Sequence, residues 1–405
     1  MRLHHLANVK VVETPFVLTL PAAAAPAAGY PVVVWGHPLT SYRMSMLGLA
    51  NALAGSGKAL LAIDLPRHGD RATCVGAKDA LGIQPATSDD DACADAAAQK
   101  CETSAASPSY GRCVARVAAD RASCSYSPVP AVITITDDAG CFAQDQGRCL
   151  PDGKCEGGTW KAVDNQPAIS GWNFINSNFF SVRDNLLTPV SDLAQIVRVI
   201  EATGPGSLSA TLGASKLDPA QIDYVGMSFG GVTGAIASSF APKVRRVALN
   251  AAGADLPSLL LYGLTPEAQG AFLAGAAENG LTMGTPAFDQ FIGILRWILD
   301  PADAANQARF ALEGAGAPAT RAVLIQYVEG DPVMPSANTE RLIAAASAAA
   351  KKPAVVKNTG APAVVGADRH AYLITGLMGG ATAAHQQLTA QAQAQVVNFI
   401  NGGAP

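Results

Sequence analysis

The stretch "YVGMSFGG", residues 224–231, decides how this chain is interpreted. It puts Ser228 between Gly226 and Gly230, directly after a short apolar run and before the small-residue segment "GGVTGAIASSF" (230–240). A serine on a sharp strand-to-helix turn needs small neighbours, because larger side chains would collide with the adjacent strand and helix. The alternative is a glycine-lined helix start packed close to a sheet. The order of strand, Gly-x-Ser-x-Gly and helix favours a nucleophile elbow, with Gly226 and Gly230 flanking the nucleophile Ser228.

Short β-branched runs alternate with helical patterns on both sides of this turn. Strands are expected at "YPVVVWG" (30–36), "KALLAIDLP" (58–66), "IDYVG" (222–226), "VRRVALNAA" (244–252), "AVLIQYVEG" (322–330) and "PAVVKNTG" (353–360). Helices are expected at 45–57, 188–204, 230–240, 343–350 and 386–400. In the second of these, Thr188 is the expected N-cap and Pro189 the first helical residue. The alternation predicts the α/β class, with a doubly wound, mostly parallel sheet.

All eight cysteines fall in one segment that interrupts this alternation: Cys74, Cys93, Cys101, Cys113, Cys124, Cys141, Cys149 and Cys155. An even number in a Gly-, Asp- and Ser-rich stretch predicts local disulfides and an oxidising compartment. A metal cluster is disfavoured because no Cys-x-x-Cys pair occurs, and the pairing stays open among about 105 possibilities. We expect a cysteine-rich insertion at 71–180, a helical cap or lid at 253–315, and an α/β core at 1–70, 181–252 and 316–405.

Composition narrows the possible partners. Charged residues are 15% of the 405, against roughly 25% in ordinary proteins, and the formal net charge is −4. No basic stripe exists for nucleic acid, and no run of roughly 20 apolar residues predicts a membrane span. The N-terminus "MRLHHLANVK" lacks the apolar region of a secretory signal. Because disulfides are expected, we interpret the chain as the mature or trimmed part of an exported precursor, secreted or extracytoplasmic. The sequence does not define an oligomeric state.

A serine hydroxyl needs a base, and the base needs an anion to hold its tautomer. His370, in "ADRHAYL", follows the last predicted strand, where a loop at the carboxyl edge of the sheet can reach Ser228. Asp331, in "YVEGDPVMP", follows the preceding strand and is favoured over its rivals Glu329 and Asp368. The order Ser228, Asp331, His370 is that of a doubly wound hydrolase. The other histidines are expected to be terminal, loop or surface residues: His4, His5, His37, His68 and His385.

An oxyanion hole would complete this set of groups. One expected donor is the backbone N–H of Phe229, the residue after the nucleophile. The second is expected from "HPLTSYR", the loop that follows the 30–36 strand. Pro38 has no N–H, so Leu39 is the next candidate, and the His37 side chain is expected to brace the loop.

Taken in order, the segments "AIDLPRHGD", "GMSFGG", "EGDPVMP" and "DRHAY" resemble the α/β-hydrolase superfamily. More narrowly, "RDNLLTPVSDLAQIV", "IDYVGMSFGGVTGA" and "LRWILDPADAANQARF" are similar to bacterial extracellular lipases of the virulence-factor type. Those enzymes usually have His-Gly where this chain has His37-Pro38. The resemblance implies the fold of that superfamily and the same triad of Ser228, Asp331 and His370.

The sequence therefore predicts a carboxylic ester hydrolase that works through an acyl-enzyme, without a metal or organic cofactor. Lipid esters, short aliphatic esters and polyesters remain possible substrates. Apolar cap residues are expected to line an acyl pocket: Phe288, Phe291, Ile292, Ile294, Leu295 and Trp297. A serine peptidase or amidase of the same fold is the main alternative, and a non-catalytic binding protein is a second. Turnover of esters against anilides separates the first from the prediction, and absence of any ester hydrolysis would favour the second.

Overall fold

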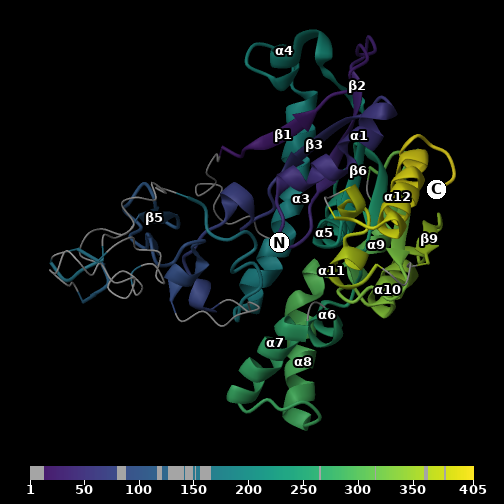
Figure 1. Ribbon diagram of the computed structural model, residues 1–405. Helices are drawn as coiled ribbons and strands as arrows, with labels where there is room; N and C mark the ends of the chain where they lie inside the picture. Colours follow the sequence, from purple (N-terminus) through teal and green to yellow (C-terminus); the bar gives the residue numbers. More distant parts are fainter. Residues whose placement is uncertain are drawn as a thin grey trace.

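A seven-stranded sheet forms the centre of the molecule (Figure 1). The computed structural model describes residues 13–79, 88–115, 121–125, 141, 149–150, 152–155, 166–263, 266–314, 316–359, 364–377 and 380–405; His4 and His5 lie outside them. The strands, in spatial order, are β1 (Phe16–Thr19), β3 (Ala59–Ile63), β2 (Tyr30–Gly36), β6 (Leu217–Met227), β7 (Val244–Asn250), β8 (Ala322–Val328) and β9 (Ala354–Asn358). Only the pair β1–β3 is antiparallel in this sheet. The predicted fold class, α/β with a doubly wound and mostly parallel sheet, is confirmed.

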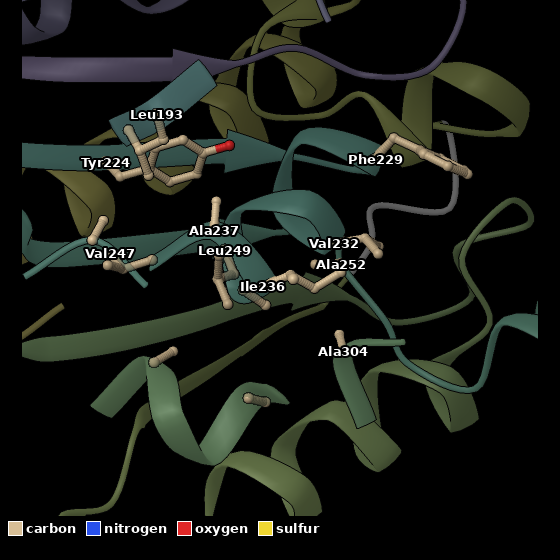
Figure 2. Close-up of a cluster of buried hydrophobic side chains, with 14 of the residues drawn as sticks. Leu193, Tyr224, Phe229, Val232, Ile236, Ala237, Val247, Leu249, Ala252 and Ala304 are labelled. Atoms are coloured by element: carbon tan, nitrogen blue, oxygen red, sulfur yellow. The ribbon is translucent and has the colours of Figure 1, made fainter. Parts of the chain in front are cut away.

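Side chains of each central strand alternate between two apolar layers. On β2, Val32 and Val34 face one layer while Val33 and Trp35 face the other. The first layer lies under α3 (Phe179–Glu201), α5 (Phe229–Ser239), α9 (Ala304–Glu313) and α10 (Ser336–Ala346), and the second under α1 (Leu47–Gly55) and α12 (Ala383–Ile400). Figure 2 shows side chains of α3, β6, α5 and β7 meeting in the first layer. Burial on both faces is why these strands read as continuous apolar runs.

Helix α3 corrects one prediction from the sequence. It begins at Phe179, and Asn178 caps it by accepting the N–H of Ser181 at 3.3 Å. Thr188 is therefore not an N-cap, and Pro189 lies inside the helix. The apolar face runs through the proline, from buried residues before it to buried residues after it, and this packing offsets the hydrogen bond that proline cannot make. The helix expected at 343–350 is also displaced, since α10 begins at Ser336 and ends at Ala346.

The described residues of the cysteine-rich segment extend to one side of the sheet (Figure 1). It contains a two-stranded antiparallel ladder of β4 (Gln99–Cys101) and β5 (Cys113–Ala115). All eight cysteines are bridged, in the pairs Cys74–Cys101, Cys93–Cys113, Cys124–Cys149 and Cys141–Cys155. The predicted local disulfides are confirmed, and they indicate an oxidising, extracytoplasmic environment.

A second group of helices follows β7: α6 (Leu256–Tyr262), α7 (Pro266–Glu278) and α8 (Pro286–Leu299). Helices α7 and α8 lie side by side and extend away from the sheet (Figure 1). The chain then returns through α9, which packs against α5 beside the sheet. In the described part of the chain, no helix is both long and apolar enough to cross a membrane.

The last strand, β9, forms one edge of this sheet. It has five residues, and the exposed and half-buried side chains alternate along it until Asn358, which is buried. Val355 and Lys357 are the exposed pair, and the Lys357 ammonium lies 3.0 Å from a carboxylate oxygen of Glu329.

Candidate active site

The strand order locates the place where a ligand is expected. The chain runs from β2 to β3 toward one edge of the sheet, and β6 to β9 then build toward the other edge. The order reverses between β2 and β6, and open α/β sheets bind ligands outside the carboxyl ends of the strands at such a point. The loop after β2 carries Leu39, and the turn after β6 carries Ser228.

Ser228 occupies a strained backbone conformation between β6 and α5. Its φ is 55° and its ψ is −121°, and its N–H donates to the carbonyl of Asn250 at 2.8 Å. A Cβ at Gly226 would lie 2.2 Å from the carbonyl oxygen of Gly230, and a Cβ at Gly230 would lie 2.0 Å from that of Gly36. Both positions therefore require glycine. This packing holds the serine in the sharp turn that presents its hydroxyl at the sheet edge.

The structure brings Ser228, His370 and Asp331 into one line of hydrogen bonds. Ser228 Oγ lies 2.7 Å from His370 Nε2, and His370 Nδ1 lies 2.8 Å from Asp331 Oδ2. The other carboxylate oxygen, Oδ1, accepts the N–H groups of Val333 and Met334, both at 2.9 Å. The three side chains follow different strands at the carboxyl edge, and their residues are 4%, 7% and 7% exposed in the order serine, aspartate, histidine.

The carboxylate fixes the protonation of the imidazole. An ionised Asp331 can only accept hydrogen bonds, so His370 Nδ1 carries the proton and Nε2 is left to accept the hydroxyl of Ser228. This is the state in which the ring can serve as a base. The rival carboxylates lie elsewhere: Glu329 pairs with Lys357 at the surface, and Asp368 is exposed in the first turn of α11 (Gly366–His370).

Two backbone N–H groups lie in the segments expected to hold an oxyanion. Phe229 is the first residue of α5, where N–H groups lack intrahelical acceptors and the helix dipole favours negative charge. Leu39 follows Pro38 in the loop after β2. Among the residues that the structure describes, neither N–H donates to a protein acceptor. Both are therefore free for an oxygen of a bound molecule.

His37 and His68 hold the loop that carries Leu39. Leu65 donates its N–H to His37 Nε2 at 2.8 Å, and Thr40 donates its N–H to His68 Nε2 at 3.1 Å. Each ring therefore carries its proton on Nδ1, which donates to a neighbouring carbonyl at 2.8 Å. Burial lowers the pKa of His37 to about 4 and that of His68 to about 3. Both rings are neutral braces, as expected for His37.

A buried polar network behind Ser228 and His370 was not anticipated from the sequence. Asn250, whose carbonyl accepts the N–H of Ser228, donates through its side chain to Gln326 Oε1 and to the hydroxyl of Tyr372, both at 2.7 Å. Burial raises the pKa of Tyr372, so its hydroxyl stays protonated. The network ties the strand beside Ser228 to the chain segment just after His370. Its sequence signal is the polar pair of Asn250, at the end of β7, and Gln326, near the end of β8.

The prediction that His385 is a surface residue is wrong. It lies near the start of α12 and is 4% exposed. Its Nε2 is 2.8 Å from the hydroxyl of Thr375. His385 is therefore a buried histidine whose ring is hydrogen-bonded to the segment that follows His370.

The apolar residues beside the site fall into two groups: those that line a small cavity, and the residues of α8 that were expected to line an acyl pocket. A small cavity of about 20 Å³ adjoins the side chain of Phe229, and its lining is entirely apolar: Ile175, Val182, Leu186, Phe229, Leu256, Leu259, Leu260 and Leu299. Of the residues expected to line an acyl pocket, Phe288 and Leu295 are buried, and Phe291 stacks with Phe272 at 6.2 Å. Ile294 and Trp297 are 49% and 71% exposed on the outer face of α8, so they do not line a closed pocket.

No protein-family model matches the chain, and neither does any curated protein. Solved structures similar to it include a putative dienelactone hydrolase from Klebsiella pneumoniae, with 11% identity over 96% of this chain and 92% of that one, at a TM-score of 0.41. A puromycin-hydrolyzing peptidase of Mycobacterium tuberculosis has 12% identity over 96% and 38%, at 0.45. Esterase 2 of Thermogutta terrifontis has 13% identity over 96% and 90%, at 0.42. Likenesses this distant support no conclusion about the chemistry of this chain.

Proposed function

We propose that this protein is a serine hydrolase of carboxylic esters, with Ser228 as nucleophile, His370 as general base and acid, and Asp331 as the group that orients the base. The observation that carries the proposal is the unbroken hydrogen-bonded line from Ser228 Oγ through the imidazole to a carboxylate. Its serine sits in a strained turn between two obligatory glycines, directly before the N-terminus of α5. A structural serine would not need that geometry.

The mechanism follows from the positions of these groups. Ser228 Oγ attacks the ester carbonyl while its proton moves to His370 Nε2, and Asp331 stabilises the imidazolium that forms. The N–H groups of Phe229 and Leu39 bind the oxyanion of the tetrahedral intermediate. His370 Nε2 then protonates the departing alkoxide, leaving the acyl group on Ser228. Water, activated by the same nitrogen, hydrolyses the acyl-enzyme and restores the hydroxyl.

The surroundings support an apolar acyl group. The cavity beside Phe229 has an entirely apolar lining, and α6 and α8 supply part of it through Leu256 and Leu299. A charged acyl chain would lose its hydration there without a partner. We assign the α6–α8 segment the role of a cap over the acyl group and the 71–180 insertion the role of a disulfide-closed unit. An exported enzyme acting on lipid, aliphatic or polymeric esters fits these features.

The test is a substrate panel. Purified protein is assayed at pH 8 against p-nitrophenyl esters from acetyl to dodecanoyl and against p-nitroanilides of the same acids, with Ser228→Ala as the control. We expect ester turnover and labelling of Ser228 by a fluorophosphonate, and neither in the variant. Predominant anilide turnover would instead favour a peptidase or amidase. No turnover and no labelling of the wild-type chain would make it a binding protein and overturn the proposal.

A further inference from the structure

A compact turn within the cysteine-rich insertion, residues 169–174, lies against the loop after β2, which is expected to hold the oxyanion. The turn is closed by two internal hydrogen bonds, from Trp172 N–H to Ile169 O and from Phe174 N–H to Gly171 O, both at 3.1 Å. The Phe174 ring meets the edge of His68 at 5.0 Å and that of Phe229 at 5.5 Å. One turn therefore touches groups on both sides of the proposed oxyanion hole.

The side chain of Ser170 binds the backbone of the loop after β2, residues 37–42. The Ser170 hydroxyl donates to the carbonyl of Ser41 at 2.5 Å and accepts the N–H of Gly69 at 2.9 Å. Ser41 is two residues beyond Leu39, in a turn closed by a hydrogen bond from Ser41 N–H to Pro38 O at 3.2 Å. The hydroxyl thus ties the turn that contains Leu39 to the loop after β3.

Gly171 packs against the same loop with no space to spare. Its φ is +83°, its N–H donates to Arg67 O at 2.9 Å, and a Cβ at this position would lie 2.9 Å from the Thr40 nitrogen and 3.0 Å from His68 Nε2. Thr40 itself has a φ of 62°, a conformation that a non-glycine residue keeps only when its surroundings enforce it. The contact with Gly171 and the hydrogen bond to His68 are those surroundings.

The other side of the turn is anchored in the bridged part of the insertion. Three hydrogen bonds make this connection: Ile169 N–H to Ala92 O at 2.7 Å, Trp172 Nε1–H to Ala77 O at 3.2 Å, and Asn173 Nδ2–H to Val75 O at 3.0 Å. Val75 and Ala92 adjoin Cys74 and Cys93 in the sequence, and Ala77 donates its N–H to the carbonyl of Cys74. Cys74 and Cys93 are bridged to Cys101 and Cys113. The bridges fix the carbonyls to which the turn is attached.

We propose that Ser170 and Gly171 are positioning residues for the oxyanion hole, and that the bridged insertion is the frame that holds them. The inference rests on the proposed ester hydrolysis. In this arrangement the insertion contributes to the rate at the transition state, where the carbonyl oxygen becomes negative and must meet the N–H of Leu39. Ground-state binding of the acyl chain, which uses the apolar wall beside Phe229, is left unaffected.

The first experiment removes the Ser170 hydroxyl and compares it with a matched hydroxyl far from the site. Ser207 makes the same pair of hydrogen bonds at the start of α4 (Leu208–Leu212), to Gly204 O at 2.8 Å and from Ala210 N–H at 3.1 Å. We expect Ser170→Ala to lower kcat for p-nitrophenyl butyrate by roughly 10-fold with little change in KM, since loosened oxyanion donors act on the transition state. Ser170→Thr should recover most of the loss, and Ser207→Ala should match the wild type.

A second readout isolates the oxyanion. Phenylboronic acid forms a tetrahedral adduct with an active-site serine and places an oxygen where the oxyanion would lie. Its inhibition constant should rise by roughly 10-fold in Ser170→Ala, and more in Gly171→Ala, where the added Cβ meets Thr40. Equal inhibition constants in the wild type and both variants would refute the positioning role.

The third experiment asks whether the bridges act through the turn. Cys93→Ser with Cys113→Ser removes a bridge beside the anchored carbonyls, and Cys124→Ser with Cys149→Ser removes one in the other half of the insertion. The first pair should lower kcat and weaken phenylboronic acid binding several-fold, and the second should leave both unchanged. Equal effects of the two pairs would overturn the inference. If the wild type hydrolyses no ester and resists fluorophosphonate labelling, the proposed function is refuted. If the wild type is active and Ser170→Ala is equally active, only the positioning role of Ser170 is refuted.

Discussion

Replacing Asp331 by asparagine tests the proposed chemistry with almost no change in shape. In the wild type, Oδ1 accepts two backbone N–H groups and Oδ2 faces His370 Nδ1. In Asp331→Asn the amide oxygen must stay in the Oδ1 position, because turning the amide would leave both N–H donors, one buried and one part-buried, without their acceptor. At about 1–3 kcal/mol for each donor, the turned amide is disfavoured by roughly 2–6 kcal/mol.

The amide NH₂ group therefore faces the ring. It can only donate, so His370 Nδ1 must lose its proton and Nε2 must carry one, which prevents Nε2 from accepting the hydroxyl proton of Ser228. The negative charge that stabilises the imidazolium is lost as well. We expect kcat to fall by about 10⁴-fold, close to 5.5 kcal/mol in activation free energy, with little change in KM.

The assay is steady-state hydrolysis of p-nitrophenyl butyrate at pH 8, with the melting temperature measured alongside. Asp368→Asn is the control, since that carboxylate is two residues before His370 and exposed. It should keep wild-type kcat. A folded Asp331→Asn enzyme with more than about a tenth of wild-type kcat would refute the assignment of Asp331 and the reasoning about the tautomer.

Three further predictions concern other parts of the molecule. Ser228→Ala and His370→Ala should each lower kcat by roughly 10³-fold or more; retained turnover in either would remove that residue from the mechanism. Gly230→Ala should prevent folding or lower the melting temperature strongly, because its Cβ would lie 2.0 Å from Gly36 O, whereas Gly275→Ala, with open space around it in α7, should be neutral or stabilising by up to about 1 kcal/mol. Burial lowers the pKa of His37 to about 4 and that of His68 to about 3, so between about pH 6.5 and pH 4 the unfolded chain binds protons that the folded chain does not. Stability should therefore fall as pH falls through this window, by at most about 1.4 kcal/mol per pH unit for each ring. The free energy of unfolding in urea is measured at several pH values for the wild type and for His68→Gln. Its dependence on pH should be weaker in the variant, and an unchanged dependence would contradict the lowered pKa of His68.

The central strands of the sheet, unlike β1, were predictable because burial on both faces leaves a simple mark in the sequence. Runs such as "YPVVVWG" have no polar side to alternate with, and the structure places β2 at Tyr30–Gly36. The meeting of Ser228, Asp331 and His370 follows from a second regularity, since each residue comes after a parallel strand and such loops share one edge of the sheet. These are properties of local sequence and of strand direction.

What could not be predicted depends on contacts between distant segments. The start of α3 was missed because a proline usually begins a helix, whereas here packing against the sheet carries the helix through Pro189. The disulfide pairing requires knowing which cysteines approach one another, and spacing does not reveal it. The contact of Ser170 with Ser41, across 129 residues, exists only because the whole insertion returns the chain to the loop after β2.

The edge strand β9 bears on how the protein behaves at high concentration. An exposed strand edge invites pairing with another chain, and natural proteins discourage this by keeping such strands short and charged. β9 has five residues and projects the ammonium of Lys357 beside the exposed Val355. Replacing that lysine by an apolar β-branched residue would leave an uncharged, apolar edge strand that can pair with another chain. The charge at this position therefore works against fibre-like self-association.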